Sequence, residues 1–208
     1  MFDFDLLQIV AGLPGLIMAM VIHEYAHARV AVAMGDFTPR LAGRLTLNPA
    51  KHVDPIGLIC LFLLHFGWAK PVMINPYNFK DPRWDDIKVS VAGPVANFLL
   101  AFIATFVYAL VIKFLGAPSQ GTMYVFTYII MFNINFGLFN LLPIPPLDGS
   151  HILKQLLPPD LAQKYESLGR YSLIILLIFL WTPIIPMILV PLQKIILSMF
   201  EFVIGIFL

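Results

Sequence analysis

The feature that most constrains this chain is a series of long apolar runs. A helix rises about 1.5 Å per residue, so roughly 20 apolar residues cross a hydrocarbon layer. Residues 6–34, 87–115 and 122–142 reach that length, and residues 171–208 form a proline-interrupted run that could make one kinked helix or two passes. Charged residues are 12% of the chain, well under the share of about 25% in an ordinary soluble domain. The sequence therefore predicts an all-α polytopic membrane protein, with about 4–6 transmembrane helices in a single domain over residues 1–208.

Shorter segments lie between the first two long runs. Residues 56–66 are apolar but reach only about half the hydrocarbon thickness, so we expect a re-entrant or interfacial segment there. Residues 40–47 and 68–75 flank that segment and are partly β-branched. They are expected to form either short membrane-associated β strands, one of which offers its edge to an extended peptide, or an amphipathic interfacial loop anchored by Trp68.

The basic residues predict how the chain crosses the membrane. The N-terminus is acidic where a signal peptide would be basic, so the first run is expected to remain as a span. The positive-inside rule places the N-terminus outside and three basic segments in the cytoplasm. Their basic residues are Arg29, Arg40, Arg44 and Lys51, then Lys70, Lys80, Arg83 and Lys88, then Lys154, Lys164 and Arg170. The sequence has no basic patch with interleaved aromatic residues, so nucleic acid is not an expected partner.

Three ionisable side chains lie together inside the first apolar run. His23 and His27 are four residues apart, so on a helix both imidazoles can reach one ion, with Glu24 beside them. Ionisable groups in a membrane helix are costly unless they pair or bind something. Zinc suits this set because it accepts nitrogen and oxygen ligands, keeps an open position and activates water. The spacing predicts one zinc site, with a metal-free hydrogen-bonded His/Glu cluster as the alternative.

A catalytic zinc usually has three protein ligands, so a third ligand at the same depth is expected. Asp148 follows the third apolar run at a proline-rich break, where the chain can fold back toward the membrane. His52, Asp54 and His151 are rival third ligands, and His151 could instead support a ligand from behind. Position alone leaves the choice among them open.

Three motifs, in order along the chain, together resemble those of the site-2 protease family of intramembrane metalloproteases. They are His23-Glu24-Tyr25-Ala26-His27, then Ala92-Gly93-Pro94-Val95-Ala96-Asn97, then Asn140-Leu141-Leu142-Pro143-Ile144-Pro145-Pro146-Leu147-Asp148-Gly149. Many family members also carry a PDZ domain or a pair of CBS domains. This chain has room for neither, so it resembles a compact form of the family.

The resemblance implies a role for each site residue. It implies that His23, His27 and Asp148 bind one zinc ion per chain and that Glu24 is the catalytic base. It also implies that Asn140 helps to bind the substrate or the developing oxyanion. The roles of His52, Asp54, Asn97 and His151 stay open.

The activity implied by the resemblance is that of an intramembrane zinc metalloprotease. Such an enzyme hydrolyses peptide bonds in or near transmembrane segments of membrane proteins, as in regulated intramembrane proteolysis. The expected partners are transmembrane protein substrates and the lipid bilayer, and the expected location is a prokaryotic cell membrane with the active site toward the cytoplasm. The main alternative is a membrane metal-binding or transport protein without protease activity, which would spread polar residues through several spans. A catalytically inactive homologue and a prenyl-protein-processing protease are further alternatives.

Overall fold

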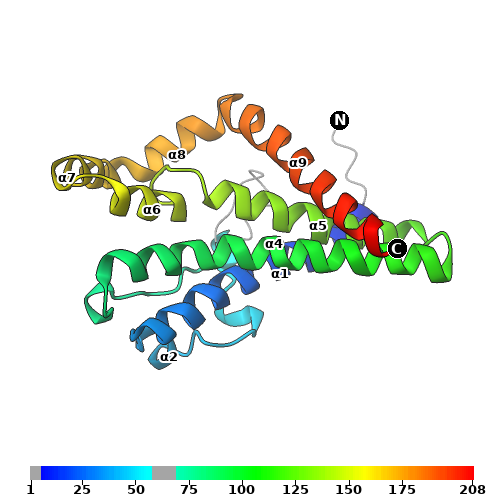
Figure 1. Cartoon of the computed structure of the whole chain (residues 1–208), viewed down its shortest axis with the longest axis horizontal. Coiled ribbons are helices and arrows are strands. Elements are labelled where there is room, and N and C mark those ends of the chain that lie inside the picture. The colour runs from blue at the N-terminus through cyan, green and yellow to red at the C-terminus, as the bar shows by residue number, and fades with distance from the viewer. Residues whose placement is uncertain (1–5, 58–68) are drawn as a thin grey trace.

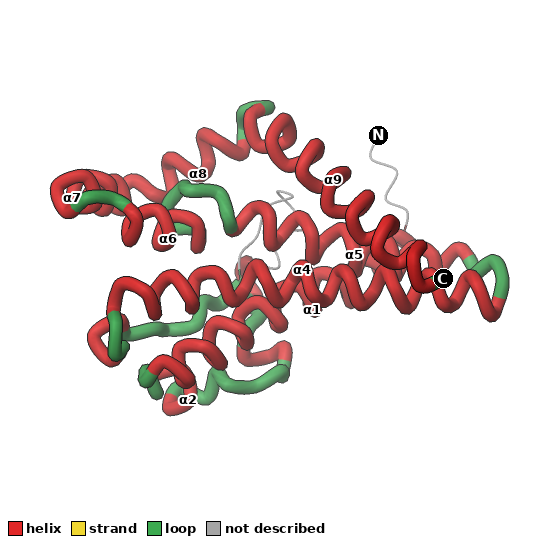
Figure 2. The backbone as a smooth tube through the Cα atoms, viewed as in Figure 1, coloured by secondary structure: helices red, strands yellow, loops and turns green. Residues whose placement is uncertain are grey.

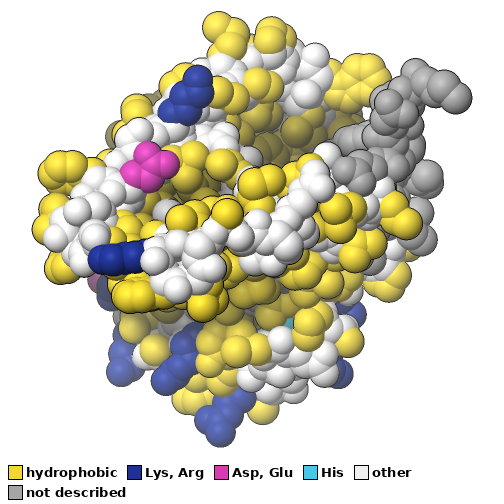
Figure 3. All heavy atoms as spheres, turned by 90° about the vertical axis from the view of Figure 1, so that its right-hand side faces the viewer, with side chains coloured by type: hydrophobic (Ala, Val, Ile, Leu, Met, Phe, Trp, Pro, Cys, Tyr) yellow, Lys and Arg dark blue, Asp and Glu magenta, His cyan; other side chains and the backbone are white. Residues whose placement is uncertain are grey.

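The computed structural model describes residues 6–57 and 69–208 (Figure 1). Four of the described helices are long and apolar enough to cross a membrane: α1 (Leu6–Met34), α4 (Pro82–Leu115), α5 (Gln120–Asn140) and α9 (Ile184–Phe207). Figure 3 shows a face on which hydrophobic side chains predominate and charged ones are few. The expectation of an all-α polytopic membrane protein is confirmed.

The three helices α1, α4 and α5 pack against one another and form the centre of the molecule. A Cβ on Gly15 of α1 would lie 2.7 Å from backbone atoms of Tyr128 and Ile129 in α5, so only glycine permits this close approach. Such small residues are the usual means by which helices associate in lipid. An apolar cluster joins α4 to α5 and consists of Ala101, Ala104, Ile130, Ile134 and Leu138.

The bounds of α4 and α5 differ from those of the expected spans, and local sequence explains the differences. The side chain of Asp81 accepts a hydrogen bond from the Trp84 N–H, and Pro82 occupies the first turn, so α4 begins five residues before the apolar run expected at residue 87. Helix α5 runs from 120 to 140 rather than from 122 to 142. Its early end agrees with the steric restriction that Pro143 imposes on the residue before it.

The C-terminal apolar run forms two helices. Helix α8 (Ser172–Leu180) has nine residues and is too short to cross a membrane alone, and α9 follows after a break at residues 181–183. In Figure 1 these helices form an inverted V above α5. Within the described residues, α9 is therefore the one helix of this run that is long enough to span a membrane. The sequence had left open whether the run forms one kinked helix or two passes.

The expected β strands are not supported. No strand occurs in residues 6–57 or 69–208, as Figure 2 shows, and the nearest feature is an isolated antiparallel bridge between Val53 and Ala69. Residues 40–47 hold the end of helix α2 (Thr38–Leu41) and the turns after it. Most of the proposed re-entrant segment, residues 58–66, and the proposed anchor Trp68 lie outside the described residues.

Residues 70–75 form no strand: the Lys70 N–H donates to the carbonyl oxygen of His52 over 2.7 Å, but several of the backbone groups that follow bond to side chains. The N–H of Val72 donates to Glu24 Oε2 over 2.9 Å, and the N–H of Asn75 donates to Asp36 Oδ2 over 2.7 Å. The buried Arg44 guanidinium donates to the carbonyls of Lys70 and Pro71. These side chains bind backbone groups that a strand partner would otherwise bind, so the β strands expected here are not supported within the described residues.

Short helices follow α5 at the end of the molecule away from the chain termini. A turn at residues 141–147 leads to α6 (Asp148–Leu156), then to α7 (Pro159–Ser167) and the 3₁₀ turn η3 (Leu168–Tyr171). Helix α6 packs against α4, as Figure 1 shows at the left of the molecule. This packing brings the start of α6 to His23 and His27 of α1.

Candidate metal centre

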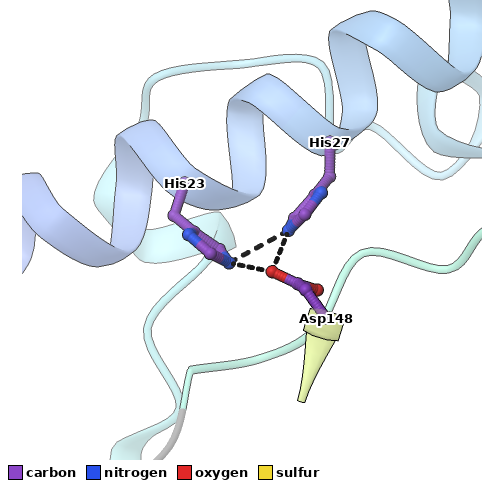
Figure 4. A group of neighbouring side chains, drawn as sticks. All are labelled: His23, His27 and Asp148. Carbon is purple, nitrogen blue, oxygen red and sulfur yellow. Dashed lines mark hydrogen bonds and ion pairs between the residues drawn. The ribbon is translucent and has the colours of Figure 1, made fainter. Parts of the chain in front are cut away.

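The side chains of His23, His27 and Asp148 converge on one point (Figure 4). Asp148 Oδ2 lies 3.1 Å from His23 Nε2 and 3.2 Å from His27 Nε2, and the two Nε2 atoms are 2.9 Å apart. Both histidines are buried, with relative exposures of 3% and 6%. Three ligand atoms from two elements that are far apart in sequence therefore meet in the interior.

Local sequence explains each position. The two histidines are one helical turn apart on α1, so their rings project from the same face. Asp148 is the first residue of α6, directly after the turn at residues 141–147. A Cβ on Gly149 would lie 2.3 Å from the carbonyl oxygen of Leu141, so this glycine allows the turn to close tightly enough to bring Asp148 back to α1.

The outer ring nitrogens of both histidines contact oxygen acceptors. His23 Nδ1 lies 2.7 Å from Asn97 Oδ1, and His27 Nδ1 lies 2.7 Å from the carbonyl oxygen of Val89. The Asn97 amide is fixed in this orientation because its Nδ2 donates to Ala19 O and to Asn133 Oδ1, each over 2.9 Å. Each Nδ1 must then carry the proton, and each Nε2 presents a lone pair to the centre.

This arrangement fits a zinc ion. Two imidazole lone pairs and a carboxylate oxygen point at one another, and the buried Asp148 Oδ2 has no hydrogen-bond partner within the described part of the chain. Bonds of about 2.0–2.2 Å to a tetrahedral zinc place its ligand atoms roughly 3.3–3.6 Å apart, close to the separations of the three atoms. A metal-free cluster would instead need a proton on the Nε2 atom of a histidine whose Nδ1 already carries one. That imidazole would then be positively charged.

The electrostatics of Asp148 agree with that interpretation. Burial raises the pKa of the Asp148 carboxyl, but without a metal the protonated forms of the His23 and His27 imidazoles outweigh burial and hold this pKa well below its usual range. Asp148 therefore offers an anionic oxygen across the physiological pH range, as a metal ligand must.

A cavity of about 510 Å³ opens beside the centre. Glu24 lines it with its carboxylate held by the Val72 N–H, and Asn140 lines it with its side-chain Nδ2 donating to the carbonyl oxygen of Phe136 over 2.9 Å. The ring of Phe136 packs edge-on against His23, with ring centroids 4.9 Å apart. The cavity places one carboxylate and one carboxamide beside the three converging ligand atoms.

Comparison with known proteins assigns the chain to a family. Residues 110–180 match the profile of "Peptidase family M50". YwhC of Bacillus subtilis (strain 168), which bears the name of a zinc metalloprotease, is 44% identical over 173 residues, covering 81% of this chain and 79% of YwhC. The chain belongs to peptidase family M50. The resemblance to site-2 proteases is thereby confirmed, and this M50 chain is an integral membrane peptidase.

More distant M50 relatives match over similar lengths. MJ0611 of Methanocaldococcus jannaschii is 31% identical over 154 residues, which cover 73% of each chain. Rip2 of Mycobacterium tuberculosis (strain H37Rv) is 27% identical over 176 residues, covering 81% of this chain and 66% of Rip2. Both bear zinc metalloprotease names. No solved structure matches the chain.

The rival third ligands of the M50 chain lie elsewhere. The fully buried His52 has its Nε2 2.7 Å from the carbonyl oxygen of Thr46, and Asp54 accepts hydrogen bonds from the N–H groups of Ile56 and Gly57. His151 lies at the edge of the cavity, 3.8 Å from Asp86. Within the described residues, Asp148 is the candidate that joins the two histidines.

Sequence reasoning missed several residues that support the centre. Asn133 is fully buried and holds Asn97, and a carboxamide in the middle of a membrane helix was a usable signal. The carbonyl of Val89 gave no signal, because any residue type supplies one. Gly93 lies against both imidazoles, where a Cβ would be 2.5 Å from His27 Nε2.

Proposed function

We propose that the M50 chain is an intramembrane zinc metalloprotease that cuts peptide bonds in or near transmembrane segments of membrane proteins. The observation that carries the proposal is that lone pairs of His23, His27 and Asp148 converge next to the carboxylate of Glu24. The two imidazoles are oriented by hydrogen bonds from their Nδ1 atoms to Asn97 and to the carbonyl of Val89. This donor set has the composition of a three-ligand catalytic zinc site. The transport alternative is not favoured, because the relatives are peptidases in name.

We assign His23, His27 and Asp148 as the zinc ligands. Zinc held there would act as a Lewis acid toward the scissile carbonyl and would lower the pKa of water to about 7. Glu24 then takes the proton from the attacking water and returns it to the leaving amine. The Val72 N–H, which donates to Glu24, would orient this carboxylate for both transfers, and we assign to Asn140, which lines the same cavity, the role of donor to the developing oxyanion.

The expected substrates are transmembrane helices. An apolar groove of about 380 Å³ lies between α1, α5 and α9, and its lining includes Phe136 and Phe139, which also line the metal cavity. Asn135 and Gln193 add two carboxamides to this otherwise apolar groove. Since these two aromatic side chains line both spaces, a substrate helix in the groove would lie next to the cavity of the proposed metal centre.

The proposed location is a prokaryotic cell membrane, with the metal centre toward the cytoplasm. The basic segments around Lys88 and Lys154 lie at the same end of the molecule as α6 and Asp148, and the positive-inside rule places them in the cytoplasm. We also propose that the chain forms one domain, since α5 contacts α1, α4 and α9.

Metal analysis of the detergent-purified chain tests the proposal without a known substrate. We expect about one zinc per chain in the wild type, clear loss in Asp148→Ala, and retention in Glu24→Gln, which should be unable to cleave. Asp160→Ala, at an exposed position on α7, is the matched control and should keep its zinc. A wild-type chain that takes up no zinc on reconstitution would refute the assignment.

A further inference from the structure

One buried carboxylate on α4 contacts the helix that carries the proposed third ligand. Gln155 Nε2 donates to Asp86 Oδ2 over 2.7 Å, and His151 Nδ1 lies 3.8 Å from the same oxygen. Both partners belong to α6, and Asp148 is the first residue of that helix. Positions 148, 151 and 155 follow spacings of three and four residues, so their side chains share one side of α6.

Asp86 is buried, with a relative exposure of 6%. A buried carboxylate is costly unless other groups compensate its charge. In residues 6–57 and 69–208, the recorded side-chain partners of Asp86 are the two α6 residues. The Asp86 carboxylate also raises the pKa of the His151 imidazole and so favours its charged form. Asp86 thus gains its compensation only while α6 is docked on α4.

Helix α6 depends on such docking. It has nine residues, which is too short for a helix to be stable alone in water, and it follows a turn rather than continuing α5. A second contact ties its far end to α4, because Arg83 Nε donates to the carbonyl oxygen of Gln155 over 2.7 Å. The position of Asp148 is therefore fixed at its own end by the tight turn at Gly149 and at the other end by α4.

We propose that Asp86 is a positioning residue for the third metal ligand: by holding His151 and Gln155 it docks α6 so that Asp148 Oδ2 reaches the two imidazoles. The proposal rests on the proposed zinc site and adds a residue that lies in none of the three sequence motifs. Asp86 lines the same cavity as the ligands but acts through α6.

The test compares Asp86→Ala with Asp85→Ala in the full-length purified protein. Asp85 is a neighbouring carboxylate on the same helix and is buried to 3% exposure, but it bonds to Lys88 Nζ and to the Asp81 N–H, not to α6. Zinc affinity is measured by chelator competition, and the melting temperature is measured with zinc and with EDTA. Loss of a residue that orients a metal ligand typically weakens metal affinity by about 10–100-fold, which is the expected result for Asp86→Ala. Asp85→Ala should lower both melting temperatures alike and keep wild-type affinity.

A variant on α6 keeps the proposal testable if Asp86→Ala does not fold. Gln155→Ala removes the donor from the other side and should also weaken zinc binding, and the double variant should lose less than the sum of the two single losses. Wild-type zinc affinity in Asp86→Ala or Gln155→Ala, beside a wild type that binds one zinc, would overturn the positioning role and leave the zinc site standing. A wild type without zinc would overturn both proposals.

Discussion

At the scale of single residues, the proposed metal centre depends on the absence of a side chain as much as on the three residues assigned as its ligands. Gly93 of α4 faces both imidazoles, and a Cβ there would lie 2.5 Å from His27 Nε2 and 2.6 Å from His23 Cε1. The rings cannot retreat easily, because each Nδ1 is held by an oxygen at 2.7 Å. The glycine is therefore required by the rings opposite it.

We expect Gly93→Ala to displace at least one imidazole and to abolish stoichiometric zinc binding. Gly205→Ala on α9 is the matched control, since a Cβ there meets no atom within 4 Å and the change should stabilise the helix slightly. Zinc content and the rise in melting temperature on zinc addition measure the effect. Wild-type zinc content in Gly93→Ala would contradict the packing argument.

At this scale the sequence predicted the residues of the proposed metal site, but not the contacts that hold them in position. The spacing of His23 and His27 predicted that they share a helix face, and the structure places both Nε2 atoms 2.9 Å apart. Asp148 was one of four candidates by position, and only the family resemblance selected it. Its approach to α1 depends on a tight turn and on the docking of α6, and neither follows from local spacing.

At the scale of helices, apolar length predicted the spans well because membrane thickness constrains them directly. Helix α1 has the bounds that were expected, whereas α4 begins earlier because a cap and a proline start a polar first turn. The strand prediction is not supported over residues 69–75, where the side chains of Arg44, Glu24 and Asp36 bind backbone groups of residues 70–75. Such side-chain partners come from distant parts of the sequence and leave no local pattern.

The groove between α9 and the central helices is the proposed path of the substrate helix. Val190 lines this groove, so Val190→Trp should fill it and lower cleavage of a reconstituted single-span substrate several-fold. Val203→Trp lies on the same helix outside the groove and should leave cleavage unchanged. Zinc content should stay at the wild-type level in both variants. Equal cleavage by the two variants would exclude the groove as the substrate path.

At the scale of the whole molecule, the charge pattern predicts an orientation. In a Cys60→Ser background, Ser119→Cys in the turn before α5 should react with a membrane-impermeant maleimide in intact cells. Ser167→Cys at the end of α7 should react only after the membrane is opened. Both positions are exposed, so differences in labelling report the side of the membrane rather than burial. The reverse pattern would place the metal centre on the outer side.

The architecture beyond the central helices was less accessible to sequence reasoning. Composition and length predicted the fold class, but the prolines of residues 171–208 allowed one helix or two. The structure has a nine-residue helix and one span, and the span α9 lines the groove together with α1 and α5. Tertiary packing decides between these outcomes, and a local pattern cannot.

The place where α4 touches the histidines also sets how much of a substrate helix must melt. Gly93 follows Lys88 by five residues, so the imidazoles lie about 7.5 Å along the helix axis from that charge, which marks the cytoplasmic boundary in the proposed orientation. Two or three residues of extended chain cover that distance, at roughly 3.3 Å per residue. In the proposed mechanism, a substrate would have to lose about one and a half helical turns, the length that spans this depth, for a peptide bond to reach the zinc, and the rest of its hydrogen bonds could stay closed in the lipid.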